Sequence, residues 1–306
     1  GIDEVVIDAE AAYVITGGFG GFGLAVASYL IAQGARHVVL IGRSGATTEA
    51  AKNQIEAWRA TGITVREALL DIASREAVDG LFAELSAERA VKGIMHVAGV
   101  VQDVRIADMT RDQLAAVMRP KVLGAWNLHT CSARHRLPLD HFVLFSSIAS
   151  LVGNGGQANY VAANAVLDSL AAYRMACGLP ASSINWGALA GVGMATNDEL
   201  LRQFQLMGVI PFDAAEAMTA LHAILRFQPA QIAVMNVDFV QWGKFEPTGG
   251  KSMRFAHLTG KRGGGANQSM AESLRQLAAA ERFTVVELML AEQVAHTLRI
   301  PAERID

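Results

Sequence analysis

The stretch that decides the fold is TGGFGGFG, residues Thr16–Gly23. It follows a short apolar run, Ala12–Thr16, and opens a segment with helical patterning. Gly18, Gly20 and Gly23 have the spacing G-x-G-x-x-G, in which glycines permit a tight turn and bring backbone N–H groups close to a pyrophosphate at a helix N-terminus. A glycine-rich turn kept only for tight packing would look similar. The order of strand, loop and helix nevertheless favours a dinucleotide-binding unit.

The composition is that of a folded protein rather than a disordered one. The chain has 306 residues and a mass of 32.5 kDa, and 52% of its residues are hydrophobic. This is enough apolar side chain for one large domain and part of a second. The formal net charge of −3 gives no reason to expect a nucleic acid or an anionic membrane as a partner.

The sequence predicts neither a disulfide framework, nor a metal site, nor a membrane span. Cys131 and Cys177 are too few for a framework, which favours a reducing, cytoplasmic compartment, and the eight histidines lack metal-ligand spacing. Residues 11–35 and 142–167 carry no charged side chain. Clustered glycines interrupt the first stretch, and amides and hydroxyls that hydrocarbon would penalise interrupt the second. The start at Gly1, without a signal peptide, indicates a piece of a longer chain.

Short apolar runs alternate with helical patterns as far as about residue 240. Runs that are apolar at nearly every position indicate strands buried on both faces, so the alternation predicts an α/β fold with a doubly wound parallel sheet of Rossmann-like type. Ligands of such sheets bind beyond the carboxyl ends of the strands. The expected strands are Ala12–Thr16, Val38–Ile41, Thr64–Leu69, Gly93–Val97, His141–Phe145, Ser182–Asn185 and Ile232–Met235. The expected helices include Phe22–Gln33, Glu49–Thr61, Arg75–Ala87, Arg111–Arg134 and Ala158–Cys177.

The pattern changes near Asp238, so we expect residues 1–242 to form the nucleotide-binding domain. Residues 243–268 contain seven glycines and five Lys or Arg, which is typical of a linker. Residues 269–306 are expected to form a C-terminal helical segment. A single amphipathic helix of this kind cannot bury its own apolar face.

The residue that would select between NAD and NADP is Arg43. Enzymes that use NAD place an acid about twenty residues after the glycine loop to bind the ribose 2′-hydroxyl. Arg43 stands at that distance from Gly23, followed by Ser44, and a guanidinium there could pair with a 2′-phosphate. A surface arginine at a strand end is the alternative. The missing acid favours NADPH as the cofactor.

Two polar residues near the middle of the chain could converge on one carbonyl oxygen. Ser147 ends the strand that starts at His141, and Tyr160 opens a helix thirteen residues later. A phenol can donate a proton while a hydroxyl stabilises the developing alkoxide. Each residue alone is more simply explained as an interface aromatic or a helix cap. Together, beside a nucleotide loop, they predict a carbonyl-reducing site.

Several ordered motifs carry a family resemblance over about residues 11–240. Besides the glycine loop they are HVAG (His96–Gly99), FSSIASLVGNGGQANYVAANAVLDSLA (Phe145–Ala171) and INWGALAGVGMA (Ile184–Ala195). These motifs resemble the ketoreductase domain of type I polyketide synthases. Ketoreductases of animal-type fatty acid synthases are similar, and all belong to the short-chain dehydrogenase/reductase (SDR) superfamily.

The resemblance implies roles for further residues. Ordinary short-chain reductases carry Tyr-x-x-x-Lys, whereas here Asn164 follows Tyr160 and the lysine would be Lys121 of the segment RPKVLGAWNL. Ser147, Tyr160, Lys121 and Asn164 would then form the catalytic tetrad. We expect the Lys121 ammonium to lower the pKa of the Tyr160 phenol. The implied cofactor-binding residues are Gly17, Gly18, Phe19, Gly20, Gly21, Phe22, Gly23, Arg43, Ser44, Asp71, Ile72, Val97, Ala98, Gly99, Lys121 and Tyr160.

Product configuration and a substrate cover are also implied by the resemblance. One ketoreductase class has a Leu-Asp-Asp fingerprint, of which Asp103 keeps only the last residue, and the opposite class has a Trp where Val152 stands. Both facts favour D-configured, usually 3R, alcohols. Residues 187–207 are expected to cover the substrate, with Met194 in contact with its acyl chain.

We therefore expect a polyketide synthase ketoreductase that uses NADPH to reduce β-ketoacyl thioesters on an acyl carrier protein bearing phosphopantetheine. Other synthase domains would act in cis, and residues 269–306 resemble the start of such a carrier protein. Two alternatives remain open: a free-standing SDR reductase of small ketones, and a catalytically silent structural ketoreductase module.

Overall fold

The computed structural model describes residues 5–190, 204, 206–245, 255 and 258. The chain divides into two compact units, Gly1–Thr196 with Pro211–Met235, and Asn197–Ile210 with Asn236–Asp306. The first unit contains the large sheet and every described residue of the expected site. Most of the expected linker 243–268, all of the helical segment 269–306, and Met194 lie outside the described residues.

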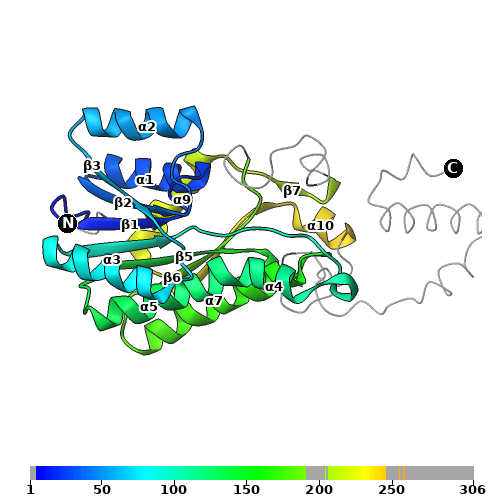
Figure 1. Ribbon diagram of the computed structural model, residues 1–306. Helices are drawn as coiled ribbons and strands as arrows, with labels where there is room; N and C mark the ends of the chain where they lie inside the picture. Colours follow the sequence, from blue (N-terminus) through cyan, green and yellow to red (C-terminus); the bar gives the residue numbers. More distant parts are fainter. Residues whose placement is uncertain (1–4, 191–203, 205, 246–254, 256–257, 259–306) are drawn as a thin grey trace, which may run out of the picture. The chain divides into compact units, whose positions relative to one another are not determined.

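A seven-stranded sheet forms the centre of the first unit, with strand order β3-β2-β1-β4-β5-β6-β8 (Figure 1). Each neighbouring pair is parallel, so the expected Rossmann-like α/β fold is confirmed. The strands are β1 (Ala12–Thr16), β2 (His37–Gly42), β3 (Thr64–Leu69), β4 (Val91–His96), β5 (His141–Ser147), β6 (Ser182–Trp186) and β8 (Gln231–Val234).

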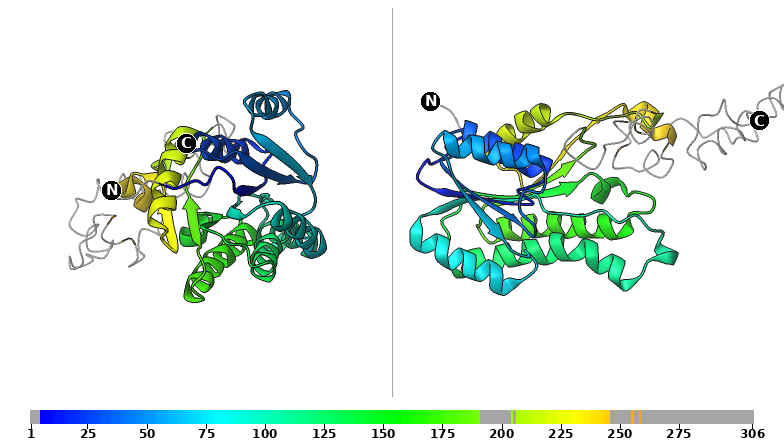
Figure 2. Two further views of the ribbon diagram at one scale, coloured as in Figure 1. Left: turned by 90° about the vertical axis from the view of Figure 1, so that its left-hand side faces the viewer. Right: turned by 45° about the horizontal axis from the view of Figure 1, so that its top comes forward.

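Helices cover both faces of the sheet (Figures 1 and 2). On one face, buried side chains of α1, α2 and α9 join one apolar core cluster, and on the other, those of α3, α5 and α7 join a second. Burial on both faces explains why the central strands are apolar at successive positions. Among the described residues, no helix is long and apolar enough to cross a bilayer. The bounds are α1 (Gly21–Ala32), α2 (Glu49–Ala60), α9 (Ala214–Phe227), α3 (Arg75–Glu88), α5 (Gly124–Arg134) and α7 (Ala158–Ala176).

The expected helical segment Arg111–Arg134 is helical over its whole length, but it is not a regular α-helix throughout. The structure has α4 (Arg111–Met118), a wide π-helical turn η2 (Arg119–Leu123) and then α5. Pro120 has no N–H to continue the ladder of α4, and its ring clashes with the preceding turn, so the backbone widens there. The side chain of Lys121 is buried in this turn.

Smaller elements complete the described part of the chain. In the first unit these are η1 (Ile106–Asp108) and α6 (Ala149–Val152). In the second unit, β7 (Val209–Ile210) pairs antiparallel with β9 (Asn236–Val237), followed by α10 (Phe239–Phe245). The rings of Phe239, Trp242 and Phe255 pack together in that unit.

Gly17 and Gly23 show why the loop between β1 and α1 needs glycine. Gly17 has a φ of +64°, the left-handed region that side chains disfavour. A Cβ atom on Gly23 would lie 2.8 Å from the Cα of Gly18, so the first turn of α1 fits against the loop only because Gly23 has no side chain. The loop conformation therefore depends on these two residues.

We predict that Gly23→Ala lowers the free energy of unfolding by about 2 kcal/mol or more, because the added methyl overlaps loop backbone. Urea unfolding measures the change. Gly80→Ala is the control, since nothing lies within 4 Å of a Cβ at this exposed helix position, and it should stabilise by about 0.5–1 kcal/mol. Equal effects of the two changes would contradict the prediction.

Candidate active site

A cavity of about 380 Å³ opens at the carboxyl ends of the strands. From β1 the sheet continues to one side through β2 and β3, and from β4 it continues to the other side through β5, β6 and β8. The direction in which strands are added therefore reverses between β1 and β4, and such a switch point is where open α/β sheets bind ligands. The volume lies in the range of small-molecule sites. Its lining comes from the ends of β1 and β2, the segments after β3 and β4, and α4 with η2: Thr16, Gly17, Ile41, Gly42, Arg43, Leu70, Asp71, Ile72, Ala98, Gly99, Val100, Ala116, Arg119 and Pro120.

The glycine loop is anchored by its own backbone and by two aromatic rings. The Gly18 amide donates to the Ile41 carbonyl at 3.2 Å. The Phe22 ring packs edge-on against Phe145, with ring centroids 5.3 Å apart, and the Phe19 ring covers Gly42, where a Cβ would lie 2.6 Å from it. Both rings therefore fix the loop. The exposed Gly20 and Gly21 lie between them.

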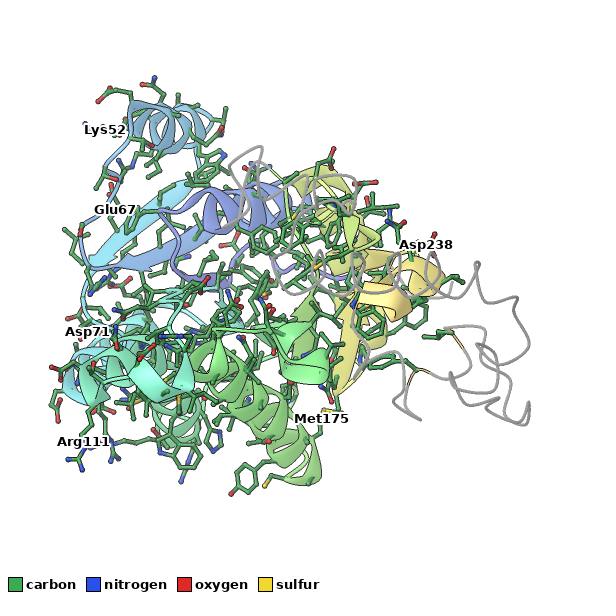
Figure 3. The ribbon with its side chains drawn as sticks, turned by 90° about the vertical axis from the view of Figure 1, so that its right-hand side faces the viewer. Lys52, Glu67, Asp71, Arg111, Met175 and Asp238 are labelled. Atoms are coloured by element: carbon green, nitrogen blue, oxygen red, sulfur yellow. The ribbon has the colours of Figure 1, made fainter. Side chains whose placement is uncertain are left out.

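The cavity is lined by three charged side chains, Arg43, Asp71 and Arg119. Arg43 lines the cavity from the turn after β2, and both it and the neighbouring Ser44 are exposed. Asp71, labelled in Figure 3, follows β3 and accepts from the Arg119 guanidinium at 3.3 Å. The structure thus brings the expected Arg43, Asp71 and Ile72 to one cavity, together with a second arginine that the sequence did not single out.

Lys121 is a buried ammonium, with 3% of the residue exposed. Its Nζ donates to the Phe145 carbonyl at 2.8 Å and lies 5.5 Å from the centroid of the Tyr160 ring. Burial lowers the pKa of Lys121 to about 8, and the Asp168 carboxylate acts against that fall. A Cβ on Gly99 would lie 2.7 Å from the Lys121 Cε, so the HVAG turn needs glycine where the lysine passes.

A buried imidazole ties the Lys121 backbone to the sheet. His96 is fully buried, and its Nε2 lies 3.0 Å from the Lys121 carbonyl, which can only accept. Nε2 therefore carries the proton, and Nδ1 accepts from the Thr16 hydroxyl at 2.8 Å. That hydroxyl in turn accepts from the Ala98 amide at 3.1 Å. Burial lowers the pKa of His96 to about 3, so the ring is neutral.

Tyr160 stands at the start of α7 and is 7% exposed. Burial raises its pKa above 10, while hydrogen bonds with Ser147 and Asn164 act in the opposite direction. The net pKa of Tyr160 is therefore raised, where a lowered one was expected, because the loss of water outweighs the groups that favour the phenolate. Tyr160 is protonated at neutral pH, as a proton donor must be.

Ser147 and Asn164 both contact the phenol, but they are held differently. The Ser147 Oγ accepts from the Ala149 amide at 3.2 Å, which leaves its own proton free to be donated. The Asn164 Nδ2 donates to the Tyr160 carbonyl at 2.8 Å, one turn earlier on α7. Asn164 Oδ1 is buried without a partner among the described atoms. The four expected catalytic residues therefore lie together, and their roles stay predictions.

The segment with Asp103 lies against the loop that precedes Tyr160. Asp103 is exposed, and its Oδ1 accepts from the Gln157 Nε2 at 2.9 Å. The Val104 amide donates to the Gly156 carbonyl at 2.7 Å. Gln157 stands three residues before Tyr160, so Asp103 is brought to the amino end of α7.

Sequence reasoning missed Thr16, His96 and Asp168. Thr16 ends β1 just before the glycine loop, and His96 ends β4 at the HVAG turn. Both stand at the carboxyl end of a parallel strand, which is where α/β sheets bind ligands. Asp168 follows Asn164 by four residues, which places it next along the same side of a helix. The described part of the chain contains no group of three or more His, Cys, Asp or Glu that could hold a metal ion.

A family model described as the KR domain matches residues 11–191. NorB of Streptomyces orinoci, a spectinabilin polyketide synthase system protein, is 36% identical over 313 residues, which cover 98% of this chain and 14% of NorB. Pks1 of Mycobacterium tuberculosis is 41% identical over 233 residues, 74% of this chain and 14% of that protein, and carries the word inactive in its name. This chain thus spans only a small part of these relatives.

The fold is also shared with solved structures. One, described as an A-type ketoreductase from a modular polyketide synthase, has a TM-score of 0.75 and 36% identity. The match covers 90% of this chain and 55% of that one.

We predict that His96 makes unfolding sensitive to acid. Because its pKa is lowered to about 3 from about 6.5 in an unfolded chain, the unfolded state binds more protons between these values, and stability falls as the pH drops below about 6.5. Between pH 7 and pH 5 the natural chain should lose about 2 kcal/mol more than a His96→Gln variant. Urea unfolding at both pH values tests this, and equal losses would contradict it.

Proposed function

Because this chain belongs to the KR-domain family of polyketide synthases, an SDR-type oxidoreductase family, we propose that it reduces β-ketoacyl thioesters to β-hydroxyacyl thioesters with NADPH. The observation that carries the proposal is the position of Lys121. Its ammonium is buried against the Tyr160 ring although it comes from η2 rather than from the helix of the tyrosine. A buried amine beside a buried phenol and the Ser147 hydroxyl supports carbonyl chemistry.

The chain's residues fit a nicotinamide cofactor, which the fold of the family implies. The glycine loop is close-packed at Gly17 and Gly23 but open at Gly20, where a Cβ would meet nothing nearer than 3.5 Å. This leaves backbone N–H groups accessible to a pyrophosphate. Arg43 at the cavity supports NADPH rather than NADH. When bound, the cofactor supplies the hydride.

Tyr160 and Ser147 act on the oxygen of the substrate carbonyl. The Tyr160 phenol is protonated and donates its proton to that oxygen as negative charge develops. Ser147, held by the Ala149 amide, donates a hydrogen bond to the same oxygen. The positive charge of Lys121 then stabilises the phenolate that remains, and Asn164 holds the first turn of α7 in place through the Tyr160 carbonyl.

We propose a carrier-bound thioester as the substrate because the relatives are polyketide synthases several times the length of this chain. An acyl carrier protein and further synthase domains in cis would be its partners. The word inactive in the name of Pks1 keeps one alternative in view, a silent structural module. Here the glycine loop, Ser147, Tyr160 and Lys121 are all present, which favours an active enzyme.

The proposed product is the D-configured, 3R alcohol. Asp103 and the absence of Trp at Val152 support it, and the hydrogen bond between Gln157 and Asp103 links that segment to the start of α7. Chiral analysis of the reduced thioester tests the assignment, and an L alcohol would overturn it.

We predict that Tyr160→Phe lowers the rate of NADPH oxidation with a diketide thioester about 10²- to 10⁴-fold, because the proton donor is lost. NADPH affinity should be retained. Tyr173→Phe, on the same helix but 52% exposed, is the matched control and should keep full activity. Turnover of small ketones but not of the thioester would favour a free-standing reductase, and binding without any turnover would favour a silent module.

We predict that Arg43→Ala weakens NADPH binding about 10- to 100-fold and leaves NADH binding nearly unchanged, since a charged hydrogen bond to a phosphate contributes about 1.5–3 kcal/mol. Titration of both cofactors by calorimetry measures this. Arg36→Ala is the control, because Arg36 is exposed just before β2 whereas Arg43 follows it. Equal loss of both cofactors in Arg43→Ala would contradict the proposed role.

A further inference from the structure

Asp168 lies close to the proposed active site, and the proposed reaction gives its carboxylate no role. It lies on α7, whose carboxyl end is marked by Met175 in Figure 3. Tyr160, Asn164 and Asp168 are successive i, i+4 neighbours, so they form one strip along that helix. The strip runs from the phenol down to the carboxylate, which therefore lies beneath the site.

Four hydrogen-bond contacts surround this carboxylate. Its Oδ1 accepts from the Ser183 hydroxyl at 2.6 Å, and its Oδ2 accepts from the Ser150 hydroxyl at 2.7 Å. The Asn185 amide lies 3.0 Å from the first oxygen and 2.9 Å from the second. The Asn185 Oδ1 accepts from Gln231 Nε2 at 3.0 Å, which fixes the Asn185 amide with its N–H groups toward Asp168.

The same donors reach the backbone that carries the catalytic serine. The Ser150 hydroxyl lies 2.9 Å from the Ser147 carbonyl as well as 2.7 Å from Asp168. The Asn185 Nδ2 lies 3.3 Å from the Ser147 carbonyl and 3.1 Å from the Ser146 Oγ. Asp168 thus links α7 to the end of β5 and to β6 at the level of Ser147.

We propose that Asp168 is a positioning residue of this active site: it holds the Ser147 turn against α7, and it places a negative charge on the strip of α7 that leads to the Tyr160 ring and Lys121. The inference rests on the proposed function, because it concerns the proposed Lys121–Tyr160 pair. Its electrostatic part can be measured without turnover.

The groups around the Lys121 ammonium determine how strongly it depends on the negative charge of Asp168. The neutral imidazole of His96, on β4, contacts the Lys121 backbone carbonyl, and from β5 the ammonium faces the Phe145 carbonyl. From α7 it faces the protonated Tyr160 phenol and, further along, Asp168. Asp168 is the carboxylate that raises the pKa of Lys121 against the effect of burial. Without it, the lysine would lose its proton closer to neutral pH.

A purely structural role explains the geometry less well. Even a partly buried carboxylate such as Asp168 loses some hydration, and apolar side chains of similar volume hold a helix on a sheet at no such cost. The two hydroxyls and the amide could also bond to one another or to backbone carbonyls. A charge at this position is useful only if another group in the site responds to it, and Lys121 does.

The experiment compares Asp168→Asn with the natural chain. We expect the Lys121 Cε resonance, followed by NMR in protein with ¹³C-labelled lysine and assigned with Lys121→Arg, to titrate near pH 8 in the natural chain. In the variant it should titrate lower by on the order of one pH unit. The alkaline limb of the rate profile for diketide thioester reduction should move by the same amount. Asp140→Asn, at the opposite end of β5, should move neither.

Two further variants separate the parts of the proposal. Ser150→Ala keeps the charge but removes one link to Ser147, and it should lower kcat several-fold without moving the Lys121 titration. Asp168→Ser replaces Asp168→Asn if the amide prevents folding.

An unchanged Lys121 titration in the charge-removing variant would overturn the proposal, whatever happens to the melting temperature. Failure of both Asp168 variants to fold by circular dichroism would also overturn it, because Asp168 would then belong to the core. A shifted titration in a chain that does not reduce thioesters would overturn the proposed function and leave the electrostatic assignment standing.

Discussion

The hydrogen bond from the Lys121 ammonium to the Phe145 carbonyl constrains the whole site. A buried cation is tolerated only where an acceptor replaces the lost water, and here that acceptor belongs to the backbone of β5. To reach it, the lysine must enter from η2, where Pro120 has widened the helix. It must also pass Gly99, which has no side chain in its way. The wide turn, the glycine and the strand end therefore form one arrangement.

Charge in this site is controlled by the exclusion of water. Burial keeps Tyr160 protonated and His96 neutral, while Lys121, with its pKa lowered to about 8, keeps its proton at neutral pH. Two of these groups are thus neutral and one is positive at neutral pH, and the pKa values of all three are shifted away from their ordinary ranges. Such divergence among neighbouring titratable groups is typical of active sites and unusual in ordinary cores.

The sequence predicted the sheet well because burial on both faces makes a strand apolar at nearly every position, as in Val38–Ile41 and His141–Phe145. It predicted the turn between β1 and α1 because the glycines of Thr16–Gly23 permit a tight connection from a strand to a helix. It predicted the extent of the helical segment Arg111–Arg134 but not the wide turn η2, since a proline within a helical pattern does not reveal whether the helix ends or widens. It also gave the wrong sign for the pKa of Tyr160, because the depth of burial is a property of packing. Asp168 was missed for a related reason: only the fold brings β5 and β6 to its carboxylate.

The contact between Thr16 and His96 joins residues 80 positions apart, and the Lys121 acceptor lies 24 positions further along the chain than the lysine. A site of high contact order cannot assemble locally while the chain is being synthesised, since loop closure must precede its contacts. The glycine loop is no exception, because the Phe22 ring packs against Phe145 and the Gly18 amide donates to the Ile41 carbonyl. The loop and the buried lysine therefore reach their final geometry together, once distant strands of the sheet have paired.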